Sequence, residues 1–417
     1  MRLKQHLQCI RRTSELGKRG GLTLIAAAAL SAVVHAQAWG EESNDVVYAE
    51  SNSPAGNAIL AFKNDGSGKL TFLSSTPAGG TGVYDPSFAL GPFDSDQNLL
   101  VSRRRSLLFA VNSGSNSIAV FHIRSDGSLS AVSGSPFPSG GSDPVSVGLL
   151  GDVLTVVNKA QDPAQNTNRT LPNYTTFHVD HDGTLDPVDR STVPVAYGSS
   201  PSQALIAAQG PFVFGADFQA GLLQSFVVDE DGRLHQHPPR AIPDSVYADA
   251  DAPHLPLGLR THPKLPILYV DLVTISKVAV FQYGEHGVLS FVRTVTDSGQ
   301  APCWVVVNHP GTRLYVTNTG DNSVSVYDLR DPWQPKEIQH FVMAGTTGSP
   351  FSTVIDDSDR FIYVSSEVSG ASSAAAANAI HTLQVGSDGT LSEPFPPTVL
   401  PVNGVARAQG VAVFSTK

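Results

Sequence analysis

The stretch QAPCWVVVNHPGTRLYVTNTGDNSVSVYDL, from Gln300 to Leu329, decides the fold of this chain. It contains two apolar runs of strand length, and a polar Asn-Thr-Gly-Asp-Asn turn leads into alternating apolar and polar residues. Alternation predicts a half-buried β-strand, and a short apolar run bounded by turn residues is typical of a buried strand. The stretch therefore predicts consecutive short strands joined by tight turns.

This pattern occurs seven times along the chain. In each copy an apolar strand ends near a polar residue, and a turn then leads into an alternating strand. Besides the opening stretch, the copies are residues 107–123, 212–228 and 267–283, with weaker ones at 46–62, 153–179 and 361–385. A repeat of this kind indicates one supersecondary unit that is copied and stacked.

Two further markers keep a common register in most copies. A short turn such as Asp-Gly-Ser-Leu (126–129) or Asp-Gly-Thr-Leu (182–185) follows six copies, and its glycine supplies the positive φ of a tight hairpin. The sixth copy has Asp-Pro-Trp-Gln-Pro-Lys instead. Counting back sixteen residues from Asn318, Asp217, Ser366, Asn112 and Asp271 reaches Pro302, Pro201, Pro350, Asp96 and Leu255. Each unit therefore holds four short strands in about 50 residues.

Seven such units predict an all-β chain that folds as a seven-bladed β-propeller. Each blade buries its faces against its neighbours, so a single blade is not expected to fold alone. The first copy begins at Val46 without an innermost strand, and an isolated strand-like segment, residues 403–414, follows the last copy. We expect this C-terminal segment to be the innermost strand of blade 1 and to close the ring. Two β-sandwiches are the alternative.

The first 38 residues differ in composition from the rest of the chain. Six basic residues precede the apolar run 22–34, and Ala-Gln-Ala follows at 36–38, which is typical of a cleaved secretory signal. The pair Arg11 and Arg12 leaves twin-arginine export open beside general secretion. We therefore expect residues 1–38 to be a signal peptide, residues 39–417 to form a single propeller domain, and the protein to be periplasmic or secreted.

Charge and composition exclude several classes of partner. The formal charge of the chain is −10, and removal of residues 1–38, with six basic residues and one acidic residue, changes it to −15. An acidic protein of this kind is not expected to bind nucleic acid or an anionic membrane surface. We also expect a monomer without a membrane span, since no later stretch has 18 apolar residues. Cys303 would be the last cysteine, which excludes an intramolecular disulfide.

Several stretches resemble the secreted branch of the lactonase-like seven-bladed β-propeller family, whose cytoplasmic relatives include phosphogluconolactonase and carboxymuconate cyclase. The similar stretches are FAVNSGSNSIAVF (109–121), PVSVG (Pro144–Gly148), QAPCWVVV (300–307) and LYVTNTGDNSVSVYD (314–328). The last one is also similar to the repeat of bacterial surface-layer propellers. The resemblance covers about residues 46–414, and it implies the fold and a small lactone as the substrate class.

The sequence departs from that family where the resemblance implies catalytic residues. Catalytic relatives carry an Arg-His pair after a proline on one innermost strand, and a Glu just after the residue that ends the next strand. The corresponding positions here hold Leu257, Gly258 and Leu272, and Ser202 replaces a further histidine at the start of blade 4. Any lactonase chemistry must therefore use other residues.

Side chains of the innermost strands alternate between the channel and the blade interior. We therefore predict that the residues at one equivalent position in each blade form a ring around the channel. This ring consists of Asn98, Ser146, Gln203, Leu257, Trp304, Ser352 and Asn403. We predict that its polar members and Trp304 bind a small polar ligand, such as a sugar or a sugar acid. The alternative is a wet channel that is lined by small polar residues and binds nothing.

Three residues near the channel mouth are candidates for acid–base chemistry. Lys159 and Glu367 each follow the polar residue that ends a strand, and His254 precedes the first strand of blade 5. In a lactone hydrolysis, His254 or Glu367 would activate water as the base, and Lys159 would stabilise the oxyanion. They belong to blades 3, 5 and 7, which are not neighbours, and solvated loop charges are the alternative.

The sequence predicts no cofactor and no protein metal site. His178 and His181 lie close together beside an Asp-Gly turn, but further zinc ligands are lacking. The resemblance leaves a divalent cation in the channel open.

Two functions are compatible with these observations. The first is an exported lactonase-like propeller that binds a small lactone or sugar-derived ligand at the channel mouth; if active, it would be a carboxylic ester hydrolase. The second is a non-catalytic propeller that binds a protein or a cell-envelope glycan.

Overall fold

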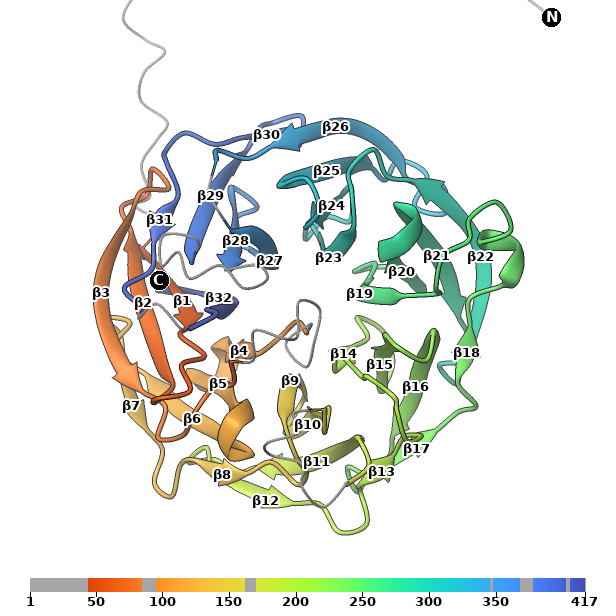
Figure 1. The fold of residues 1–417 in the computed structure, drawn as a ribbon. Coiled ribbons are helices and arrows are strands. Elements are labelled where there is room, and N and C mark those ends of the chain that lie inside the picture. Colours follow the sequence, from red (N-terminus) through yellow and green to blue (C-terminus); the bar gives the residue numbers. More distant parts are fainter. Residues whose placement is uncertain are drawn as a thin grey trace, which may run out of the picture. The chain divides into compact units, whose positions relative to one another are not determined.

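The computed structural model describes residues 44–84, 95–161, 170–345, 348–367, 378–402 and 406–416, all within one compact unit, Glu42–Lys417. These residues form seven antiparallel sheets, which surround a central channel as blades (Figure 1). The prediction of a seven-bladed β-propeller from the repeats is therefore confirmed.

Blades 2 to 7 each take their strands in chain order from the channel outwards. The innermost strands are β4 (Leu99–Ser102), β9 (Pro144–Leu150), β14 (Leu205–Ile206), β19 (Pro256–Thr261), β23 (Pro302–Val307) and β27 (Ser349–Ile355). The second strands are β5 (Leu107–Asn112), β10 (Val153–Asn158), β15 (Phe212–Asp217), β20 (Ile267–Leu272), β24 (Arg313–Asn318) and β28 (Phe361–Glu367). The third strands are β6 (Ser117–Ile123), β11 (Asn173–Val179), β16 (Leu222–Val228), β21 (Lys277–Tyr283), β25 (Ser323–Asp328) and β29 (Ala379–Val385).

The outer strands are of two kinds. In blades 5 and 6 they are continuous, β22 (Leu289–Thr296) and β26 (Lys336–Val342). In blades 2, 3, 4 and 7 two short pieces pair with the third strand: β7 (Leu129–Ala131) and β8 (Phe137–Pro138), β12 (Leu185–Pro187) and β13 (Val193–Pro194), β17 (Leu234–Gln236) and β18 (Arg240–Ala241), β30 (Leu391–Ser392) and β31 (Thr398–Val399). Short 3₁₀ turns lie at η1 (Arg103–Arg105), η2 (Ser113–Ser115), η3 (Asp244–Val246) and η4 (Val273–Ile275).

Blade 1 combines the two ends of the described chain. Its outer three strands are β1 (Asn44–Glu50), β2 (Ala58–Asn64) and β3 (Leu70–Pro77), and its innermost strand is β32 (Gln409–Thr416). β32 pairs antiparallel with β1, so that Tyr48 lies opposite Ala412. The predicted closure by the C-terminal segment is confirmed, with the strand beginning at Gln409.

The Asp-Gly turns also connect neighbouring blades. Gly127 and Gly232 both have φ near +81°, as a turn glycine requires. The Gly127 carbonyl in blade 2 accepts a hydrogen bond of 2.8 Å from the Tyr48 hydroxyl in blade 1. The Gly389 carbonyl in blade 7 accepts one of 3.1 Å from Tyr315 in blade 6. These turns therefore hold each blade against the preceding one.

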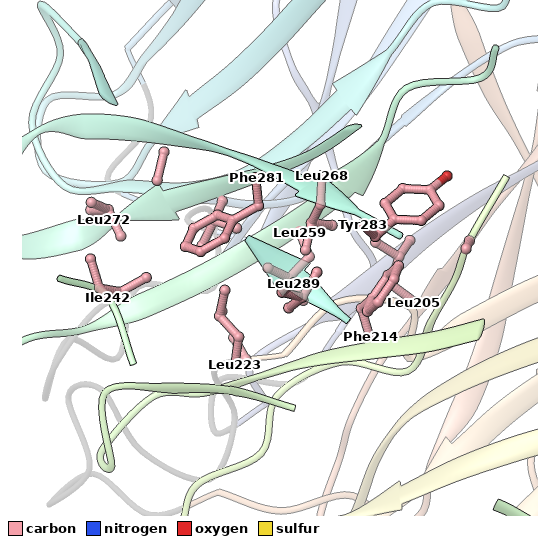
Figure 2. Packing of buried hydrophobic residues seen from close by; sticks show 14 of the residues in the cluster. Leu205, Phe214, Leu223, Ile242, Leu259, Leu268, Leu272, Phe281, Tyr283 and Leu289 are labelled. Carbon is pink, nitrogen blue, oxygen red and sulfur yellow. The ribbon is translucent and has the colours of Figure 1, made fainter. Parts of the chain in front are cut away.

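The core is divided among the junctions between blades. Seven apolar clusters fill the seven junctions of the described chain, one at each. In Figure 2, Phe214 and Leu223 of blade 4 face Phe281 and Leu289 of blade 5. Full burial of one such side chain contributes roughly 1.5–3 kcal/mol, so the junctions supply most of the packing energy.

In the described part of the chain, no helix has the length and apolar character that a membrane crossing requires.

Candidate functional site

The rim at one end of the channel is formed by two sets of connections, those that follow the second strands and those that precede the innermost strands. Each described second strand has a buried polar residue at or next to this end, and these are Glu50, Asn112, Asn158, Asp217, Asp271, Asn318 and Ser366. The Asn318 Nδ2 donates to the hydroxyls of Ser323 and Ser325, both at 3.0 Å. The Asp217 Oδ1 accepts from the Ser200 backbone N–H at 2.7 Å. These side chains therefore hold the rim turns of their own blades.

In blade 5 the observed strand register differs by one residue from the register that the repeats predict. Pro256 lies opposite Leu272, as Pro302 lies opposite Asn318, and a bulge follows in both innermost strands. Leu272, and not Asp271, is thus the counterpart of Asn318. Asp271 corresponds to Thr317, one residue further inside the strand. The repeats favoured Asp271 because it is polar, whereas the residue at the corresponding position, Leu272, is apolar.

Lys159 and Glu367 occupy corresponding rim positions in blades 3 and 7. Lys159 follows the last residue of β10, and Glu367 follows Ser366 at the end of β28. Both side chains are buried, with residue exposures of 0 % and 7 %. The Glu367 Oε2 accepts a hydrogen bond of 3.2 Å from the Gln409 Nε2 at the start of β32. A buried ammonium and a buried carboxylate therefore lie on the same rim of the channel.

His254 lies on the connection between blades 4 and 5. Its ring stacks on that of Tyr247, with 3.8 Å between the centroids and 15° between the planes. The side chain is partly exposed. Within the described residues, no hydrogen bond or ion pair links His254 to Lys159 or Glu367, so the structure does not bring the three candidates into one contact.

The polar members of the predicted ring are buried and bonded to neighbouring strands. Asn98 donates to the Val145 carbonyl of blade 3 at 2.9 Å, and the Ser146 hydroxyl accepts from the Ala204 N–H of blade 4 at 3.0 Å. Gln203 donates to the Leu259 carbonyl of blade 5 at 3.2 Å and accepts from the Leu259 N–H at 3.0 Å. These groups tie the innermost strands together, and their ligand-binding role stays a prediction.

Trp304 belongs to an apolar wall on the opposite side of the ring. It is fully buried, and its ring meets that of Phe351 edge-on at 5.8 Å. Phe218, Leu257, Val273 and Cys303 complete this cluster. Asn403, the remaining predicted member, lies outside the described residues. The register of β32 places Val411 at the position that Trp304 has in blade 6.

A charged group that the sequence did not predict lies in the channel itself. The Asp96 Oδ1, on the connection into β4 of blade 2, accepts a 2.6 Å hydrogen bond from the Ser352 hydroxyl of blade 7. The Asp96 Oδ2 lies 3.7 Å from the Arg260 Nη2 of blade 5. In Figure 1 the chain leading into β4 extends towards the centre of the ring. Asp96 therefore connects blades that are not neighbours. A signal existed in the sequence, because Asp96 stands where three other copies have proline.

Two other carboxyl groups are buried at or next to the ends of second strands. Glu50 ends β1, and its Oε1 accepts a hydrogen bond from the Asn57 Nδ2. Burial raises the pKa of Glu50 well above its usual range. Burial also raises the pKa of Asp271, and the nearby Asp297 carboxylate adds to this. Such groups favour the neutral, protonated form.

No group of three or more His, Cys, Asp or Glu side chains is placed to hold a metal ion among the residues that the structure describes.

Comparison with known proteins identifies the family. The family model described as lactonase, 7-bladed β-propeller, matches residues 164–394, which is more than half of the chain. The chain belongs to this family. No curated protein matches the sequence of this lactonase propeller.

Solved structures share the fold at low sequence identity. A candidate 6-phosphogluconolactonase from Bacteroides uniformis has a TM-score of 0.66 and 16 % identity, over 90 % of this chain and 100 % of that one. A periplasmic gluconolactonase from Pseudomonas aeruginosa has a TM-score of 0.65 and 14 % identity, over 89 % of this chain and 99 % of that one. At such identities the likeness of these structures to this lactonase propeller concerns the fold.

Proposed function

We propose that this lactonase propeller is an exported protein that binds a small lactone or sugar-derived ligand at the channel mouth and hydrolyses it. The observation that carries this proposal is the buried Glu367 carboxylate, held by Gln409 on the same rim as the buried Lys159. Family membership supports the lactone as substrate class. The composition of residues 1–38 supports export through a signal peptide, with residues 39–417 as the mature domain.

In this proposal Glu367 is the general base. Its carboxylate takes a proton from water, and the oxygen of that water forms a bond to the lactone carbonyl carbon. The resulting alkoxide is stabilised by the Lys159 ammonium. When the tetrahedral intermediate collapses, the ring C–O bond breaks and the leaving oxygen receives the proton from Glu367. The product is an open-chain hydroxy acid. We assign His254 a contact with the ligand, since it is stacked on Tyr247 and partly exposed.

Hydrolysis of gluconolactone by the purified protein tests this proposal. Glu367→Gln keeps the shape of the side chain and its contact with Gln409 but removes the base, so the rate should fall about 10²–10⁴-fold. Lys159→Met should also lower the rate, and His254→Ala should mainly raise KM. Equal rates for wild type and Glu367→Gln, above spontaneous hydrolysis, would contradict the role of Glu367.

The second candidate is a non-catalytic propeller that binds a protein or an envelope glycan. The observation in its favour is the apolar character of blade 5 at the rim, where Leu257 and Gly258 stand in place of the relatives' Arg-His pair. In the observed register Leu272 ends the second strand, so the residue in place of the relatives' Glu is Val273, which is apolar and largely buried. Absence of turnover on every lactone, together with retained binding to envelope material, would favour this candidate.

A further inference from the structure

We propose that Arg260 is a carboxylate-binding residue in the central channel, and that the Asp96 carboxylate lies beside its guanidinium when no ligand is bound. This rests on the proposed function in one respect: the hydroxy acid that lactone hydrolysis releases would supply the carboxylate. The binding of such an acid is nevertheless measurable without any turnover.

The direction of Arg260 follows from its strand. Leu259 packs into the apolar cluster between blades 4 and 5, and successive side chains of a strand point to opposite faces. Arg260 therefore points away from that cluster, and its Nε donates to the Val305 carbonyl of blade 6 at 3.1 Å. Its side chain retains 27 % exposure, and the guanidinium has a backbone contact with Val305.

The contact between Arg260 and Asp96 is incomplete. The distance of 3.7 Å between Nη2 and Oδ2 exceeds that of a hydrogen bond, and the Asp96 Oδ2 has no hydrogen-bond partner in the described structure. A guanidinium prefers two parallel hydrogen bonds to one carboxylate. Asp96 does not provide them, whereas a free ligand carboxylate can adopt that geometry.

Asp96 is held in this place by unusual local structure. It lies on a connection, three residues before β4, and Gln97 next to it has a φ of +63°, which residues other than glycine seldom adopt. The Gln97 side chain accepts a 3.0 Å hydrogen bond from Gln203 of blade 4, and Ser352 of blade 7 fixes the Asp96 Oδ1. Two other blades therefore position a carboxylate against Arg260, and this carboxylate takes the place of the ligand's.

The chemical class of the ligand follows from this arrangement. Asp96 presents a carboxylate, and displacement of Asp96 would free the Ser352 hydroxyl, a neutral donor of the kind that binds sugar hydroxyls. A small polyhydroxy acid matches both features. Binding must displace Asp96, so removal of its charge should strengthen the binding of the acid.

The test is isothermal titration calorimetry of the full-length protein with D-gluconate, and with D-glucose as the neutral comparison. Asp96→Asn keeps the shape and still accepts from Ser352, and it should bind gluconate at least about tenfold more tightly than wild type. Asp152→Asn makes the same change of charge on an exposed turn and should leave the affinity unchanged.

Arg260→Gln should abolish gluconate binding in both the wild-type and the Asp96→Asn background. Arg260→Lys, which keeps the charge but loses the two-pronged geometry, should retain weak binding, and it serves as the second variant if Arg260→Gln fails to fold. Unchanged affinity in Asp96→Asn, or glucose binding as tight as gluconate binding, would overturn the proposal. Gluconate binding that depends on Arg260, in a protein without lactone turnover, would uphold this proposal while refuting the catalytic one.

Discussion

Replacement of Asp271 with Asn should stabilise the protein, and the gain should grow with pH. Asp271 is fully buried, and neither of its carboxyl oxygens has a hydrogen-bond partner in the described structure. Burial and the Asp297 carboxylate raise the pKa of Asp271 well above its usual range. Asn has nearly the same shape and does not ionise. The corresponding Thr317 of blade 6 has a neutral hydroxyl, 3.1 Å from the Trp304 carbonyl oxygen.

The magnitude follows from proton linkage. In the pH range above the unfolded-state pKa of an Asp, about 3.9, and below the raised pKa of the folded state, only the folded chain keeps the Asp271 proton. The free energy of unfolding therefore falls as pH rises, by about 1.4 kcal/mol per pH unit from this group. Asp271→Asn removes that dependence. Between pH 5 and pH 7 its advantage over wild type should widen by about 2.7 kcal/mol at most.

The assay is urea denaturation of both proteins at pH 5, 6 and 7. Glu50 and Asp96 also have pKa values raised by burial, but they are present in both proteins and cancel in the difference. Asp217→Asn is the control, because the Asp217 carboxylate accepts hydrogen bonds from the Ser200 N–H and from Gln224. That variant should be destabilised at every pH. A difference between Asp271→Asn and wild type that stays constant with pH would refute the reasoning.

The remaining predictions concern packing, closure and substrate. Trp304→Ala should lower the free energy of unfolding by about 3–5 kcal/mol, because it leaves a cavity in the apolar wall; an unchanged thermal melt would contradict this packing. Removal of residues 409–417 should leave β1 unpaired and cause aggregation, and a soluble truncated chain that melts at the full-length temperature would argue against the role of closure. Phosphorylated gluconolactone should not be hydrolysed above its spontaneous rate, since Leu257 and Gly258 replace the relatives' Arg-His pair. Robust turnover would show that other residues supply those groups.

Most of the fold could be predicted from the sequence, because the evidence for it is local and repeated. The Asp-Gly turns and the alternating strands specify contacts within one blade. The unpaired segment after the last copy matches the first blade, which lacks an innermost strand of its own. The sevenfold recurrence of the strand pattern then indicates the ring. The predicted register of blade 5 is one residue off, because Leu272 is apolar where the other copies have a polar residue, and the polar Asp271 directly precedes it.

The site was less accessible to sequence reasoning, because its contacts join distant blades. Lys159 and Glu367 could be placed on the rim from the repeat alone. The contact of Asp96 with Arg260 and Ser352 depends on how one connection enters the channel, and no periodic pattern encodes that path. The hydrogen bonds of Asn98 and Gln203 to adjacent innermost strands likewise follow from the tight approach of those strands in the closed ring.

The position of β32 has a consequence for synthesis on the ribosome. β1 is made long before its inner partner β32, with 358 residues between Glu50 and Gln409. The entropic cost of closing so long a loop grows only slowly with its length, by about 0.6 kcal/mol per doubling. The long separation therefore delays folding more than it lowers the free energy of unfolding. Until Gln409 and the following residues emerge, blade 1 has an open inner edge and the junction with blade 7 is unfilled. Any chain that terminates before Gln409 keeps those edges exposed to proteases and chaperones.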